Sequence, residues 1–252
     1  MRIPLLLPTI LLAVISGLGC RTPAPATNSD RRVETPALTR AAIKTNSFEK
    51  DILAFEASDR INPPPKNAIL FIGSSSIRMW KTLAKDFPEY RVINRGFGGS
   101  QISDSIYFAN RIVIPYEPRA IVFYAGGNDI NAKKSPDTVF NDFKTFVSAV
   151  RGKLPATKIV YISVAPNPAR WAQIEQIREA NQLIRDYAAT QNGLSFIDVH
   201  PVMLGEDGQP KPDIYLTDKL HMNEKGYAIW KEIVGEHLGR IVPASAKSAA
   251  IR

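Results

Sequence analysis

Four short segments of this 252-residue chain bring together residue types that can do nucleophilic chemistry. Each is polar or rich in glycine: Gly73-Ser74-Ser75-Ser76, Asn94-Arg95-Gly96-Phe97-Gly98-Gly99-Ser100, Gly126-Gly127-Asn128-Asp129 and Asp218-Lys219-Leu220-His221. A serine hydroxyl is a weak nucleophile until a base takes its proton. His221 can be that base, and Asp218, three residues earlier, can fix the tautomer of its imidazole. Together these residue types point to acyl transfer.

Acyl transfer also needs hydrogen-bond donors aimed at the oxygen that becomes negative in the tetrahedral intermediate. The backbone N–H of Ser75, at the expected start of a helix, is one candidate. Gly99 allows a close approach of the backbone and can supply a second N–H. The side-chain amide of Asn128 is the third candidate.

The rest of the chain alternates short apolar runs with longer amphipathic stretches. The expected strands are Ala68–Ile72, Arg91–Asn94, Ala120–Ala125, Lys158–Val164 and Leu194–Val199. The expected helices lie near Ile77–Lys85, Ser103–Ile112, Asp137–Lys153, Trp171–Gln191 and Asn223–Leu238. This alternation predicts an α/β domain with a mostly parallel sheet and helices on both faces. The site of such a sheet lies beyond the carboxyl ends of its strands, where three of the polar segments begin.

The four segments resemble, in order, the motifs of the SGNH/GDSL hydrolase family. The matching patterns are Gly-x-Ser, Asn-x-Gly-x-x-Gly, Gly-x-Asn-Asp and Asp-x-x-His. The resemblance implies Ser75 as nucleophile, Gly99 and Asn128 as oxyanion donors beside the Ser75 N–H, and His221 as a base oriented by Asp218. It also implies a three-layer α/β/α sandwich with a five-stranded parallel sheet, a flavodoxin-like fold, and neither metal nor organic cofactor. The first motif resembles the corresponding motif in the branch of the family that contains platelet-activating-factor acetylhydrolases and lysophospholipase-like esterases.

The motif alone does not decide which serine is the nucleophile, because three serines stand in a row. The family's founding motif has aspartate between glycine and serine, and Ser74 occupies that place here. We favour Ser75, which is third from Gly73 inclusive, over Ser74, and expect Ser76 inside the helix. The common α/β-hydrolase motif Gly-x-Ser-x-Gly is excluded at this point, because Ile77 stands two residues after Ser75.

Several other residues could take part, and each has a plainer interpretation. Asp198 and His200 form a rival acid–base pair on an extended segment, although His200 fits a structural role better. His237 is expected at the surface of the last helix. Trp171 could wall the substrate pocket, and Asp104 could contact the substrate.

Two further possibilities concern binding. Arg170 could also contact the substrate. The loop Gly73–Ser76 could instead hold a phosphate at a helix start, which would make the protein a binding module. That interpretation leaves Asp218 and His221 unexplained.

The N-terminus resembles a bacterial lipoprotein signal. Residues 1–19 have a positive start and a short apolar stretch, as in a signal peptide. The only cysteine, Cys20, follows small residues and would be the lipidated one, although Gly17 stands where leucine is usual. The expected product is anchored by lipid in the bacterial cell envelope, at the outer membrane or in the periplasm of a Gram-negative source, and is secreted if it is not lipidated.

Composition sets the remaining limits. Hydrophobic residues make up 44% and charged residues 22% of the chain, which indicates a packed core. We expect a flexible tether over 20–46, a hydrolase domain over 47–242 and a disordered tail over 243–252. The net charge of +8 is scattered along the sequence, which disfavours a nucleic-acid partner. One cysteine excludes a disulfide framework within the chain and a cysteine zinc cage.

The sequence therefore predicts an envelope-anchored serine esterase. Its substrate would be a small acyl ester, a lipid such as a lysophospholipid, or an acetylated carbohydrate. The alternative is an inactive domain of the same fold that only binds acyl or glycan ligands.

Overall fold

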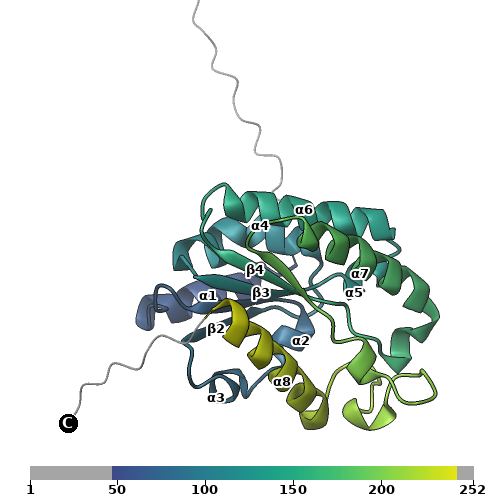
Figure 1. The fold of residues 1–252 in the computed structure, drawn as a ribbon. Coiled ribbons are helices and arrows are strands. Elements are labelled where there is room, and N and C mark those ends of the chain that lie inside the picture. Colours follow the sequence, from purple (N-terminus) through teal and green to yellow (C-terminus); the bar gives the residue numbers. More distant parts are fainter. Residues whose placement is uncertain (1–46, 243–252) are drawn as a thin grey trace, which may run out of the picture. The chain divides into compact units, whose positions relative to one another are not determined.

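A computed structural model describes residues 47–242 as a five-stranded parallel sheet between two layers of helices (Figure 1). The strands follow the order β2-β1-β3-β4-β5, with every neighbouring pair parallel. Their bounds are β1 Ile69–Gly73, β2 Val92–Gly96, β3 Ala120–Tyr124, β4 Lys158–Ile162 and β5 Leu194–Ile197. The predicted α/β class and the five-stranded parallel sheet are confirmed.

Helices cover both faces of this sheet (Figure 1). One layer packs on the core shared by α1 Glu49–Ile61, α4 Ile102–Ile112, α6 Pro136–Arg151 and α7 Ile174–Ala189. The other layer holds α2 Ser75–Arg78, α3 Leu83–Asp86 and α8 Glu224–Ile241. A short helix, α5 Gly127–Asn131, follows β3, and 3₁₀ turns lie at Ile114–Tyr116, Pro168–Gln173, Pro201–Met203 and Pro212–Ile214.

The strand sequences explain the two layers. All five residues of β1 are buried, so this strand is apolar without interruption. Successive side chains of a strand point to opposite faces. Leu70 and Ile72 therefore join one hydrophobic cluster, while Ile69 and Phe71 join the other.

The helix predicted over Ile77–Lys85 is wrong, because the chain forms two short helices there. The Asn94 side-chain amide donates to the Ile77 carbonyl at 2.7 Å. Lys81 N–H, which a continuous helix would bond to Ile77, donates to Met79 O instead. This break turns Trp80 into the core, where it is 1% exposed.

Two other elements depart from the prediction. Helix α1 was not expected, since Ile52 is its one buried residue and its amphipathic signal is weak. Arg111 pairs with Glu49 and Glu56 and so ties α1 to α4. The helix predicted over Trp171–Gln191 begins with a 3₁₀ turn over Pro168–Gln173 and is α-helical from Ile174.

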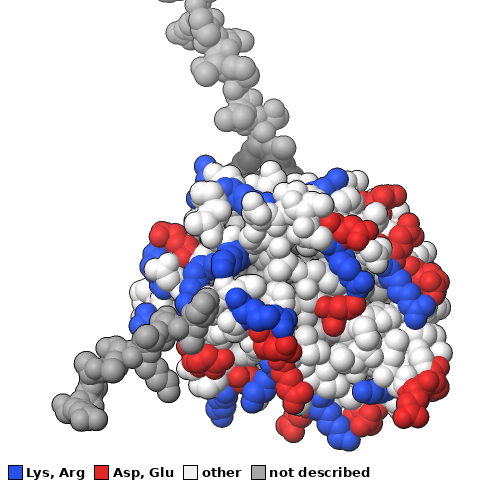
Figure 2. Space-filling model, in the orientation of Figure 1, with Lys and Arg blue, Asp and Glu red and all other residues white. Residues whose placement is uncertain are grey.

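The surface and termini bear on the remaining expectations. Figure 2 shows lysine and arginine interspersed with aspartate and glutamate on the face in view. Among the helices of residues 47–242, none has the length and apolar character needed to cross a bilayer. The predicted signal peptide 1–19, Cys20 with the tether 20–46, and the tail 243–252 lie outside the described residues.

Candidate active site

A sharp turn at the end of β1 sets the position of the three serines. Gly73 has φ of +136°, and a Cβ there would lie 1.9 Å from Tyr124 O, so only glycine fits. Ser74 donates its N–H to Tyr124 O at 3.0 Å and is 6% exposed at the N-cap of α2. Ser75 is the first residue of α2 and is half-buried. Ser76 lies within the helix, as expected.

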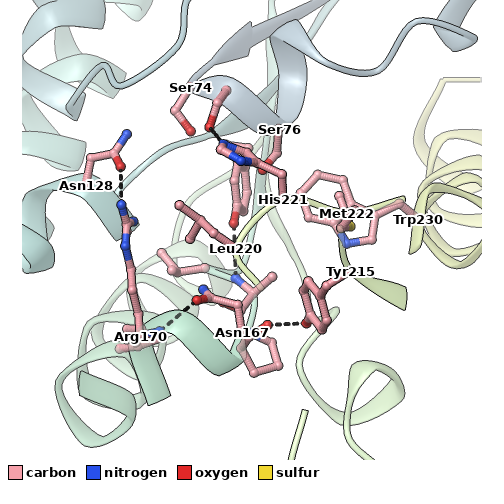
Figure 3. Close-up of a pocket in the computed structure, with 17 residues that line it drawn as sticks. Ser74, Ser76, Asn128, Asn167, Arg170, Tyr215, Leu220, His221, Met222 and Trp230 are labelled. Atoms are coloured by element: carbon pink, nitrogen blue, oxygen red, sulfur yellow. Dashed lines mark hydrogen bonds between the residues drawn. The ribbon is translucent and has the colours of Figure 1, made fainter. Parts of the chain in front are cut away.

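Ser75, His221 and Asp218 form one chain of hydrogen bonds. His221 Nε2 lies 2.9 Å from Ser75 Oγ, and His221 Nδ1 lies 2.6 Å from Asp218 Oδ2. Figure 3 shows the His221 ring directed at the serine turn. Because a carboxylate can only accept, Nδ1 carries a hydrogen, and neutral His221 then presents a lone pair at Nε2 to the Ser75 hydroxyl. The arrangement can transfer the hydroxyl proton to the imidazole.

The Asp218 carboxylate is held in its ionised form. Its pKa is lowered to about 2, chiefly by the hydrogen bond from the His221 side chain and then by the His221 backbone N–H. Asp218 Oδ1 accepts the N–H groups of Leu220 and His221, each at 2.9 Å. Asp218 is therefore charged at neutral pH and stabilises an imidazolium beside it.

The loop that carries Asp218 and His221 is anchored on both sides. Leu216 N–H donates to His221 O at 2.8 Å, and Tyr215 forms an isolated bridge with Met222. Lys219 adopts φ of +56° and donates its N–H to Leu216 O at 2.9 Å. The ring of His221 is thus held by a closed turn.

The three predicted oxyanion donors lie in neighbouring turns. Within residues 47–242, no acceptor takes the N–H of Ser75 or of Gly99. Gly99 is exposed, with φ of +88°, in the turn before α4. Asn128, on α5, lines a cavity together with Ser75 and His221. Its Nδ2 donates to Ser100 O at 2.9 Å, which places it against the turn of Gly99.

Asp129 holds two of the motifs together. It is 0% exposed and accepts the Ile102 N–H at 3.2 Å, and Lys134 donates to it at 2.9 Å. Burial raises the pKa of this carboxyl above its ordinary value. Asp129 therefore fixes α5 against the start of α4.

The three residues predicted to contact the substrate lie in three different places, and only Arg170 lines the cavity of Ser75. Arg170 lines the same cavity as Ser75 and donates from its guanidinium to Asn128 Oδ1 at 2.9 Å. Trp171 borders a different groove with Lys219 and lies under the Arg178 guanidinium. Asp104 accepts the Gln101 N–H at 2.9 Å in a capping box, which accounts for its position at the start of α4.

The rival pair Asp198–His200 is not arranged as a dyad. Asp198 Oδ1 accepts the backbone N–H of His200 at 3.0 Å, not a ring hydrogen, while Asp198 Oδ2 accepts from Arg185. His200 Nε2 is buried with no partner among the described residues. His237 is half-buried rather than on the surface, and its Nε2 lies 2.8 Å from Ser195 Oγ.

The contact between Arg170 and Asn128 was not foreseen from the sequence. The two residues are 42 positions apart, so no periodic pattern joins them. The available signal was an arginine on the loop after β4, at the same sheet edge as the other segments.

Comparison with solved structures supports the fold. A protein from Streptococcus pneumoniae named for platelet activating factor is 24% identical over 75% of this chain and 92% of its own, with a TM-score of 0.67. A Bacteroides fragilis protein described as an acylhydrolase is 21% identical over 75% and 96%, with a TM-score of 0.64. An acetyl-xylooligosaccharide esterase variant from Geobacillus stearothermophilus is 15% identical over 70% and 96%, with a TM-score of 0.57.

The sequence comparisons give the family. A search of curated proteins found no match. A model of the GDSL-like lipase/acylhydrolase family matches residues 73–229, a span that begins at the serine turn and includes the loop of His221. The expected resemblance is confirmed, and the chain belongs to the GDSL-like lipase/acylhydrolase family.

Proposed function

We propose that the protein is a serine esterase that cleaves carboxylic ester bonds through an acyl-enzyme. The single observation that carries this proposal is the hydrogen-bonded chain from Ser75 Oγ through His221 to Asp218. Membership of an acylhydrolase family supports ester hydrolysis in general. An inactive domain that only binds ligands would have no need of these linked hydrogen bonds.

In the proposed reaction, Ser75 Oγ attacks the ester carbonyl carbon while His221 Nε2 takes the hydroxyl proton. The tetrahedral intermediate collapses, the bond to the alcohol oxygen breaks, and His221 returns the proton to the leaving alcohol. Water, deprotonated by His221, then attacks the acyl-enzyme. The acid is released, and Ser75 regains its proton. Asp218 keeps the ring oriented and stabilises its positive charge throughout.

The negative oxygen of each tetrahedral intermediate would be bound by three donors. These are the backbone N–H groups of Ser75 and Gly99 and one hydrogen of Asn128 Nδ2. Neither backbone N–H has an acceptor among residues 47–242, and Ser100 O takes only one of the two Nδ2 hydrogens. All three donors therefore have hydrogens available for an oxyanion.

The substrate that fits best is an ester with a short acyl group. The cavity beside Ser75 has a volume of about 30 Å³ and is bounded by Tyr124, Tyr215 and Trp230. So little space beside the nucleophile favours a short acyl group over an extended acyl chain. An acetylated carbohydrate or another small acyl ester is favoured over a lysophospholipid, and the groove of about 590 Å³ beside Trp171 could take part of the alcohol.

The location is also a proposal. Lipidation of Cys20 would anchor the protein in the cell envelope, and each buried CH₂ contributes about 0.8 kcal/mol. In Cys20→Ser, we expect the protein to leave the membrane fraction. A wild type that is wholly soluble and carries no acyl label would contradict the anchor without affecting the esterase.

A series of p-nitrophenyl esters tests the activity and the register. The wild type should turn over the acetate faster than the octanoate. Ser75→Ala should abolish turnover with an unchanged thermal midpoint, whereas Ser74→Ala should keep most of it. Loss of turnover in Ser74→Ala, with turnover retained in Ser75→Ala, would identify Ser74 as the nucleophile. A wild type without turnover would instead favour the inactive domain that only binds ligands.

A further inference from the structure

The guanidinium of Arg170 is an unusual feature of this cavity, because it has no acidic partner within residues 47–242. Its one hydrogen bond runs from Nη2 to Asn128 Oδ1 at 2.9 Å. Burial lowers the pKa of Arg170 from its ordinary value, so the fold opposes the charge of this group. A cationic group that lies in a cleft, although burial there costs free energy, is a candidate for a role in the chemistry.

The neighbours of Asn128 fix which way its amide points. Arg170 can only donate, so it must face Oδ1, while the Ser100 carbonyl can only accept, so it must face Nδ2. Figure 3 shows Arg170 extending from its loop toward the oxygen of Asn128. With both ends held, the amide cannot flip. A flipped amide would present Oδ1 to the oxyanion and repel it.

The loop that carries Arg170 is itself held in place. Asn167 Oδ1 accepts the Arg170 N–H at 2.9 Å, and the neighbouring Ala169 donates its N–H to Lys219 O at 3.0 Å. Lys219 lies between Asp218 and His221. The same loop therefore contacts both the amide of Asn128 and the turn that carries the histidine.

We propose that Arg170 is a positioning residue that acts through Asn128, fixing and polarising its amide so that Nδ2 binds the oxyanion more strongly. Hydrogen bonds in series strengthen one another, and a charged donor at Oδ1 makes Nδ2 a better donor. The effect grows as negative charge develops on the substrate oxygen, so it falls on kcat more than on KM. This inference rests on the proposed esterase function.

A double-mutant cycle with p-nitrophenyl acetate tests the inference. We expect Arg170→Met to lower kcat by about 10- to 100-fold with KM nearly unchanged, as for loss of a charged hydrogen bond. In the Asn128→Ala background the same change should lower kcat less than about 3-fold. Arg170→Lys should recover part of the rate, because lysine keeps the charge but not the planar guanidinium.

The control is Arg240→Met, which removes one positive charge from helix α8. Arg240 pairs with the exposed Glu236 and does not line the cavity of Ser75, so kcat should stay within about 2-fold. Equal losses from Arg170→Met in both backgrounds would overturn the proposal, because Arg170 would then act independently of Asn128. A raised KM with unchanged kcat, confined to esters that carry a carboxylate, would overturn it in favour of direct substrate binding.

The side-chain amide signals of Asn128 in a ¹H–¹⁵N spectrum provide a readout that needs no turnover. Arg170→Met should shift them, while Arg240→Met should leave them in place. Unshifted signals overturn the polarisation of Asn128 even in an active esterase. Failure of the proposed function is recognised separately, because the wild type itself would then show no turnover of the ester.

Discussion

Asp218 and His221 are joined twice, once through the histidine ring and once through its backbone. Nδ1 lies 2.6 Å from Asp218 Oδ2, and the His221 N–H donates to Asp218 Oδ1 at 2.9 Å. Both bonds close within a four-residue segment, so the orientation of the ring depends mostly on local structure. A local pair of this kind explains why a short Asp-x-x-His pattern can carry information once the other three motifs accompany it.

The first prediction concerns Asp218→Asn. Loss of the carboxylate removes the charge that stabilises the imidazolium and weakens control of the ring tautomer. We expect kcat to fall by about 10²–10⁴-fold with a smaller change in KM. Steady-state kinetics and the thermal midpoint on the same sample check this.

The matched control is Asp213→Asn, which alters an exposed carboxylate paired with Lys225. Its kcat should be normal. Because the pKa of Asp218 is about 2, the wild type should show no loss of activity from protonation of Asp218 between about pH 4 and 8. A fully active Asp218→Asn would remove the carboxylate from the mechanism.

The second prediction concerns the turn that aims the serines. Gly73→Ala places a Cβ 1.9 Å from Tyr124 O at φ of +136°, so the turn must move. We expect the free energy of unfolding to fall by at least about 2–3 kcal/mol. Denaturant unfolding measures the change, and activity should fall as well because Ser75 follows the turn.

Gly239→Ala serves as the opposite control. Gly239 lies in helix α8, and a Cβ there would meet no atom within 4 Å. That substitution should raise the free energy of unfolding by about 0.4–1 kcal/mol. If both variants lose the same stability, the special geometry of Gly73 is not the reason.

Much of the fold was predictable because the inner strands of its sheet are buried on both faces. The residues of β1 and β3 form continuous apolar runs, and such runs can be read without knowledge of their neighbours. Helix boundaries were less predictable. The break after α2 depends on Asn94, which is distant in the sequence and takes the Ile77 carbonyl only in the folded sheet.

The site shows the same division between local and long-range information. The pairing of Asp218 with His221 is local, but spacing alone also offered Asp198 with His200, and the resemblance of the four motifs to a family decided between the two pairs. The contacts of Asn128 with Ser100 and Arg170 join residues 28 and 42 positions apart. Nothing in composition or periodicity encodes such pairs, because they depend on how the turns after separate strands meet.

The third prediction links two histidines to stability. Burial lowers the pKa of His200 and of His237 below the ordinary histidine value. Below about pH 6.5 the unfolded chain binds protons that these folded residues do not, so stability rises with pH. The free energy of unfolding should be at its full value above about pH 7 and fall as the pH drops toward 5.

Urea unfolding at several pH values measures that dependence. His200→Gln and His237→Gln should each flatten the curve between about pH 7 and 5, and the double variant should flatten it most. An unchanged slope in the double variant would mean that other groups dominate this pH range. The activity of His200→Gln should be normal, since the rival dyad with Asp198 is not formed.

The last prediction concerns Lys134, which donates to the buried Asp129 at 2.9 Å and to Asp142 at 2.8 Å. Lys134→Met would leave the Asp129 carboxylate in the interior without its cation. We expect the free energy of unfolding at pH 7 to fall by about 3–5 kcal/mol, as for other broken buried pairs. Lys133→Met, which removes an exposed neighbouring charge, should change it by less than about 0.5 kcal/mol.

The pH dependence of that variant identifies Asp129 as the cause. Burial already raises the pKa of Asp129, and loss of Lys134 removes an opposing charge, so the pKa should rise further. A folded-state pKa above the unfolded value means that the folded protein takes up a proton as the pH falls. The deficit of Lys134→Met relative to the wild type should therefore shrink between pH 7 and 5. A deficit that is constant with pH would show that packing of the lysine stem, rather than the stranded carboxylate, holds α5 against α4.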